Sequence, residues 1–134
     1  MSEIRKFDGG ATRDTSNGKH DLLGFMHPLC DHSYAKYMQS HRTMPDGTLR
    51  DADNWWTGFG KRVPLQSLTR HLEDLKVIHC GWFAYEVKRD GKVERDYRQY
   101  SIDKLPEGYR LLTEEECCNA IRFNVQAYLL EVLK

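Results

Sequence analysis

Two segments of this chain carry the apolar periodicity of amphipathic helices, and they constrain the fold more than any other feature. In the first segment, leucines recur at three- and four-residue steps, at Leu65, Leu68, Leu72 and Leu75. The second segment runs from 113 to about 133, and we expect these apolar side chains to face the core: Ile121, Val125, Tyr128, Leu129 and Val132. Such spacing places one apolar stripe on each helix.

The remainder of the chain predicts shorter elements. Pro28 favours the first turn of a helix over about 27–40, whereas the glycine-containing residues before 25 are typical of a loop or an ordered arm. Asp90-Gly91 between alternating residues predicts a β-hairpin. We therefore expect one domain, 1–134, with a mainly α-helical bundle and a small β-hairpin insertion at 81–110.

Composition excludes several classes of protein. Of the 134 residues, 40% are apolar and 30% are charged, with zero formal net charge. A neutral balance argues against binding to nucleic acid through overall charge. No apolar run reaches the roughly 20 residues of a membrane span. The N-terminus lacks a secretory signal, and the four cysteines are expected to be reduced and mostly buried. These features suit a cytoplasmic protein.

Both long helices carry clustered carboxylates. The first has Glu73 and Asp74, and the second begins with Glu114-Glu115-Glu116. Oxygen ligands on two facing helices would suit Mg²⁺ or Mn²⁺. The alternatives are a solvated face with local ion pairs, and a capping box in which Glu116 only supports Thr113. Along the second helix, Asn124 lies in line with Glu116, and the small Ala120 between them leaves room for a ligand.

Two further groups of residues suggest a nucleotide. Arg13 and Lys19 lie on the N-terminal arm, where they are predicted to grip phosphate oxygens. Asn54 and Trp55 lie in the long loop 41–62, where a tryptophan can stack on a base and an asparagine can bond its edge. The alternatives are a flexible charged terminus and a tryptophan that covers the core.

The order of these motifs resembles the MazG-like dATP/dGTP diphosphohydrolases found mainly in bacteriophages, within the all-α NTP pyrophosphatase group. The matching residues are Gly10-Ala11, Arg13-Asp14, Gly18-Lys19, Asp21-Leu22, Ala35-Lys36-Tyr37, Asn54-Trp55, Arg70-His71-Leu72, Glu114-Glu115-Glu116 and Phe123-Asn124. The resemblance covers most of the chain.

This resemblance implies metal-dependent hydrolysis of a purine (deoxy)nucleoside triphosphate to the monophosphate in phage nucleotide metabolism. It favours dGTP or GTP, with dATP as a further substrate, in a homodimer or homotetramer in the host cytoplasm. The implied roles are as follows: catalysis by Lys36, Arg70 and His71; substrate binding by Arg13, Lys19, Asn54, Trp55 and Asn124; metal binding by Glu73, Asp74, Glu115, Glu116 and Asn119.

One departure from the family pattern keeps an alternative open. Glu116-Cys117-Cys118-Asn119 reads as ExxN where the group has ExxD. A non-catalytic phage protein that binds a nucleotide or a protein partner would also fit this sequence.

Overall fold

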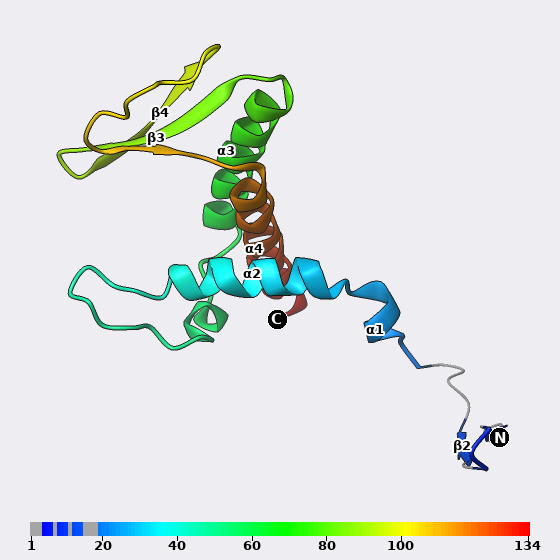
Figure 1. Cartoon of the computed structure of the whole chain (residues 1–134). Helices are drawn as coiled ribbons and strands as arrows, with labels where there is room; N and C mark the ends of the chain where they lie inside the picture. Colours follow the sequence, from blue (N-terminus) through cyan, green and yellow to red (C-terminus); the bar gives the residue numbers. More distant parts are fainter. Residues whose placement is uncertain (1–3, 7, 11, 15–18) are drawn as a thin grey trace. The chain divides into compact units, whose positions relative to one another are not determined.

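The computed structural model describes residues 4–6, 8–10, 12–14 and 19–134. The chain forms two compact units, Met1–Asp31 and His32–Lys134 (Figure 1). In the first unit, β1 (Ile4–Lys6) pairs antiparallel with β2 (Thr12–Asp14). The one-turn helix α1 (Leu22–Phe25) follows, and the Asp21 carboxylate caps it by accepting a bond from the Gly24 amide at 2.7 Å.

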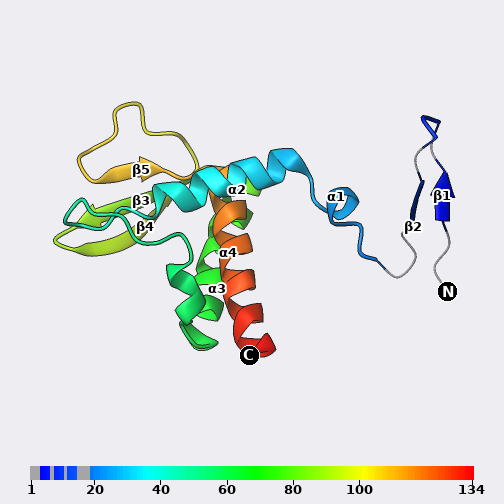
Figure 2. The ribbon, with the colours of Figure 1, turned by 90° about the horizontal axis from the view of Figure 1, so that it is seen from below.

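The second unit combines helices with a sheet. Its helices are most of α2 (Pro28–Ser40), α3 (Arg62–His79), α4 (Glu114–Leu133) and the short 3₁₀ helix η1 (Asn54–Thr57). Its strands are β3 (Phe83–Arg89), β4 (Lys92–Arg98) and β5 (Tyr109–Leu111), in the order β4-β3-β5 (Figure 2). All pairs are antiparallel.

The expectation of a mainly α-helical bundle is wrong, because the described chain has a mixed α/β architecture. The predicted hairpin is present, with Asp90 and Gly91 at φ values of 52° and 75° in its two-residue turn. The sheet, however, also includes β5, a third strand that the predicted hairpin does not account for. Among the described residues, three of the seven buried apolar side chains lie on β3: Ala84, Tyr85 and Val87. The sheet is therefore part of the core.

Close backbone contact accounts for the glycine just before β5. Gly108 has a φ of 83°, and a Cβ atom there would collide with the carbonyl oxygen of Lys88. The Lys88 amide donates to the Gly108 carbonyl at 2.9 Å. Glycine is needed at this position for both its backbone angle and its lack of a side chain.

The expectation for the core side of α4 is only partly met. Val125, Leu129 and Val132 are 46–50% exposed, and Ile121 and Tyr128 are half-buried. The residues that α4 buries are Cys117, Asn119, Ala120, Asn124 and Ala127. On α3, Leu65 and Leu72 are likewise nearly half exposed, whereas Pro64 and Asp74 are buried. On α4, packing therefore buries a face of smaller side chains. On α3, Leu75 of the predicted stripe packs against the buried cluster.

Candidate functional site: a cavity lined by cationic and aromatic side chains

The second unit contains a cavity of about 1030 Å³. Its walls come from α2, from the loop between α2 and α3, and from the first half of α4, with two residues from the sheet. Hydrogen bonds fix α2 against α4. The Asn119 amide donates to the Ser33 hydroxyl at 2.9 Å, and the Tyr34 hydroxyl donates to Gln126 at 2.9 Å.

Aromatic side chains form one part of this wall. Trp55 and Phe59 each meet the ring of Phe123 edge to face, with centroids 5.7 and 6.3 Å apart. The turn of η1 sets Trp55 half-buried against the cavity and leaves Trp56 61% exposed. The two adjacent tryptophans therefore have different surroundings, and only Trp55 lines the cavity.

Cationic side chains outnumber acidic ones around the cavity. Five cations line it, namely Lys36, Arg42, Arg50, Lys88 and Arg110, against three acids, Asp51, Glu115 and Glu116. Two interactions lie within the loop that connects α2 to α3. The Arg42 Nε donates to the Arg50 carbonyl at 2.7 Å, and Thr43 forms an isolated antiparallel β-bridge with Leu49. An excess of cations around a concave, partly aromatic surface favours an anionic ligand with a planar group.

A row of alternating charges leads from α3 across the sheet to α4. Glu86 on β3 lies opposite Arg95 on β4 and opposite Arg110 on β5. The Arg95 Nη1 is 3.7 Å and the Arg110 Nη2 is 3.3 Å from the Glu86 Oε2. Arg95 also bonds Asp74, and Arg110 also bonds Glu116. Strand register thus places these five charged residues in one continuous network, and Lys88 joins it with its Nζ 3.7 Å from the Glu86 Oε1.

Asp74 is the buried end of this row. Its carboxylate is fully buried and accepts from the Arg95 Nε at 3.0 and 3.1 Å and from the Tyr97 hydroxyl at 2.6 Å. The His71 Nδ1 lies 3.8 Å from the same carboxylate. Burial lowers the pKa of His71, while Asp74 opposes that shift. The imidazole is therefore neutral near pH 7, and Arg95 is the cation that neutralises Asp74.

A smaller cavity of about 60 Å³ lies along the charged row. Its wall includes His71, Asp74, Glu86 and Arg95. Arg110 and Glu116 line both this cavity and the larger one. The two residues thus stand at the junction between the buried ion pairs and the open site.

The structure brings together six of the residues predicted from sequence. The large cavity is lined by Lys36, Asn54, Trp55, Glu115, Glu116 and Asn119. Of these, Glu115 accepts a hydrogen bond from the Ser33 hydroxyl at 2.7 Å. The capping interaction predicted for Glu116 is only half present. Thr113 accepts from the Glu116 amide at 3.1 Å, while the Glu116 carboxylate pairs with Arg110.

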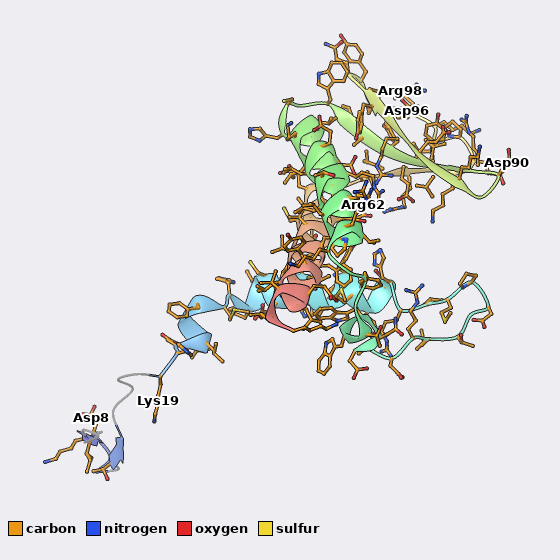
Figure 3. All side chains as sticks on the ribbon, turned by 180° about the vertical axis from the view of Figure 1, so that it is seen from behind. Asp8, Lys19, Arg62, Asp90, Asp96 and Arg98 are labelled. Carbon is orange, nitrogen blue, oxygen red and sulfur yellow. The ribbon has the colours of Figure 1, made fainter. Side chains whose placement is uncertain are left out.

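Two predicted residues of the second unit, Arg70 and Asn124, do not line the large cavity. Arg70 is exposed and donates to Ser67 at 3.1 Å. Asn124 is buried and its amide donates to the Ala120 carbonyl at 2.8 Å, so it belongs to the helix packing. Lys19 belongs to the first unit (Figure 3). The side chain of Arg13 lies outside the described residues.

The predicted metal ligands are not gathered around one point. Glu73 is 58% exposed and pairs with Lys76 at 3.2 Å on the helix surface. Asp74 is held by Arg95 and Tyr97. Among residues 4–6, 8–10, 12–14 and 19–134, no three His, Cys, Asp or Glu side chains are grouped closely enough to hold an ion together.

Several residues of the site were not identified from sequence. Arg42 and Arg50 lie in a loop without periodicity, so only tertiary structure reveals that they face the cavity. The position of Arg95 and Tyr97 in the sheet could have been predicted from the sequence of the hairpin. The two-residue turn at Asp90-Gly91 fixes the register of the hairpin, which puts Arg95 opposite Glu86.

No protein-family model, curated protein or solved structure matches this chain. Within the described residues, no helix has the length and apolar character required to cross a membrane.

Proposed function

We propose that the second unit binds a purine (deoxy)nucleoside triphosphate in the large cavity and hydrolyses it to the monophosphate. The observation that carries this proposal is the shared cavity: aromatic rings, five cationic side chains and two adjacent carboxylates all line it. Ligand pockets commonly measure about 300–1,000 Å³, so a cavity of about 1030 Å³ has room for a nucleotide.

The base would lie at the aromatic wall. Trp55 lines the cavity, where its indole ring would stack on the base, and Asn54 lines the same cavity with an amide that can bond a base edge. Stacking accepts every base, so discrimination would come from polar groups that are left unpaired by the wrong base. The preference for dGTP or GTP over dATP rests on the family resemblance.

The triphosphate would meet the cationic side chains. Lys36 lines the cavity from α2. Arg42 lines it from the adjoining loop, where its side chain bonds the Arg50 carbonyl. Phosphoryl transfer needs mainly positioning and charge neutralisation, because charge spreads over the phosphoryl oxygens in the transition state. These residues would hold the phosphates and stabilise that charge, and a nucleophilic side chain is not required.

The carboxylates fit an ion that arrives with the nucleotide. Mg²⁺ is usually bound through one or two protein carboxylates together with substrate phosphates and water. Glu115, Glu116 and Asn119 line the cavity, and they are the residues that would hold Mg²⁺ or Mn²⁺. When bound, such an ion supplies charge neutralisation and lowers the pKa of an attacking water. A preformed ion site that includes Glu73 and Asp74 does not fit their present partners.

A nucleotide panel tests the proposal. The four deoxynucleoside triphosphates and GTP are incubated with Mg²⁺ or Mn²⁺, and products are separated by chromatography. We expect purine monophosphates to form, with dGTP or GTP the better substrates. Trp55→Ala should weaken the binding of all purine nucleotides. Trp56→Ala, which alters the exposed neighbour, should leave their binding unchanged. Equal turnover of purine and pyrimidine nucleotides would rule out the Trp55 wall as the base site.

A second candidate is a non-catalytic nucleotide-binding protein. It is favoured by the pairing of Glu116 with Arg110, which occupies a carboxylate that hydrolysis would use. Isothermal titration run beside the product assay separates the two functions. Purine nucleotide binding without product formation supports the non-catalytic protein, and absence of binding removes both candidates.

Self-association and a cytoplasmic site of action complete the proposal. Half-exposed apolar side chains on α3 and α4, including Leu72 and Leu129, offer surface for a homodimer or homotetramer. Light scattering coupled to size-exclusion chromatography should give a mass of two or four chains. A single-chain mass at micromolar concentration would contradict self-association.

A further inference from the structure

Arg110 is a cation of the large cavity that is also part of the charged network of the sheet. It lies on β5, its side chain is 49% exposed, and it lines both cavities. Its Nη1 lies 2.7 Å from the Glu116 Oε1, and its Nη2 lies 3.3 Å from the Glu86 Oε2. One guanidinium thus joins a carboxylate in the cavity wall to a carboxylate in the sheet.

The two carboxylates differ in how firmly they are held. Glu86 has a side chain only 14% exposed, and it is also approached by Arg95, which is fixed by the buried Asp74. Glu116 borders the cavity, where a ligand's oxygen atoms would compete for the same guanidinium. A guanidinium binds phosphate in the same forked geometry as carboxylate. Glu86 would therefore keep Arg110 in place while its partner on the cavity side changes.

We propose that Arg110 binds the polyphosphate end of the ligand, and that Glu116 competes with the ligand for Arg110. This inference rests on the proposed function for the identity of the ligand, but its chemistry concerns the polyphosphate alone. Binding would exchange the Arg110–Glu116 pair for an Arg110–phosphate pair. The Glu116 carboxylate would be released into the cavity at the same time.

Competition has a distinctive signature: loss of Arg110 and loss of the Glu116 charge have opposite effects on affinity. Glu115→Gln is the matched control for charge, because Glu115 lies on the same wall and its hydrogen bond from Ser33 can be kept by glutamine. Arg98→Gln is the matched control for loss of an arginine. Arg98 pairs with Asp96 on β4 at 3.1 Å and does not line the large cavity (Figure 3).

The probe is inorganic tripolyphosphate, titrated calorimetrically in EDTA so that no metal ion contributes. Arg110→Gln should weaken binding by about tenfold or more, as expected for lost bonds to a charged group. Arg110→Lys should be intermediate, because lysine keeps the charge without the fork. Glu116→Gln should tighten binding about two- to fivefold beyond Glu115→Gln, the scale of an accessible ion pair. Arg98→Gln should bind like the unaltered protein.

Three results would overturn the inference. The first is that the unaltered protein does not bind tripolyphosphate at submillimolar concentration. The second is that Arg110→Gln leaves the affinity unchanged. The third is that Glu115→Gln and Glu116→Gln tighten binding equally. If Arg110→Gln does not fold, as judged by circular dichroism, Arg110→Lys decides the first comparison. If tripolyphosphate binds as described but no nucleotide does, the inference stands and the proposed nucleotide function fails.

Discussion

Replacement of Asp74 by alanine should cost the second unit a large part of its stability. The carboxylate is fully buried and holds the Arg95 guanidinium and the Tyr97 hydroxyl, which join α3 to β4. Breaking a buried ion pair by removing one partner typically costs about 3–5 kcal/mol. Arg95 keeps Glu86 at 3.7 Å and is 23% exposed, so we expect a loss near the lower limit, about 3 kcal/mol.

Urea unfolding followed by circular dichroism measures this loss. With an m-value of about 1–3 kcal/mol/M, the midpoint should fall by about 1–3 M. Tyr97→Phe removes one hydrogen bond to the carboxylate and should cost about 1.5 kcal/mol. Glu73→Ala is the matched control on the same helix, since its pair with Lys76 is exposed, and it should cost under about 1 kcal/mol.

The same experiment separates two roles for Asp74. A carboxylate kept only for metal binding would leave the midpoint near that of Glu73→Ala and would change only the titration with Mg²⁺. A carboxylate that stabilises the fold lowers the midpoint with or without the ion. If Asp74→Ala unfolds at the same urea concentration as Glu73→Ala, the structural role assigned here to the Asp74–Arg95–Tyr97 cluster is refuted.

Three further predictions concern single residues. Burial lowers the pKa of His71 below that of the unfolded chain, so acidification through about pH 6.5 should destabilise the protein. His71→Asn should reduce the pH dependence of the urea midpoint between pH 7.5 and 5.5, and an unchanged pH dependence contradicts this prediction. Burial raises the pKa of the Cys117 thiol to about 11, so a thiol reagent should modify the three exposed cysteines first and Cys117 only on unfolding. Trp55→Ala should weaken purine nucleotide binding by about 1–3 kcal/mol, measured by fluorescence titration against Trp56→Ala, and equal losses would exclude stacking on Trp55.

Composition does not predict which of the four cysteines are buried. They were expected to be mostly buried, because free cysteine usually is, but only Cys117 is buried, and Cys30, Cys80 and Cys118 are exposed. The adjacent pair on α4 explains part of this difference. Neighbouring residues of a helix point in different directions, so when Cys117 packs against Ala84 and Leu112, Cys118 faces outward.

Local sequence determined the elements whose signals lie within a few residues. The stripe of leucines predicted α3, Thr113 predicted the start of α4, and Asp90-Gly91 predicted the hairpin. The polar residues Lys36, Asn54, Trp55, Glu115, Glu116 and Asn119 were also identified, and they line one cavity. Asn54, Trp55, Glu115 and Glu116 were identified from their residue types in a loop and at a helix start, whereas Lys36 and Asn119 were implied only by the family resemblance.

Tertiary structure decided which of these residues meet and what they pair with. β5 is only three residues long and pairs with β3 across a connection that has no periodicity, so neither the third strand nor the place of Arg110 beside Glu86 follows from local pattern. The predicted apolar stripe of α4 is half-exposed because α4 buries a face of smaller side chains, whereas α3 packs Leu75 of its stripe against the core. Asp74 lies on a charged helical segment, yet it is buried. Its charge is neutralised by Arg95, which lies on β4. Burial and charge pairing depend on contacts between distant segments, which a single sequence does not encode locally.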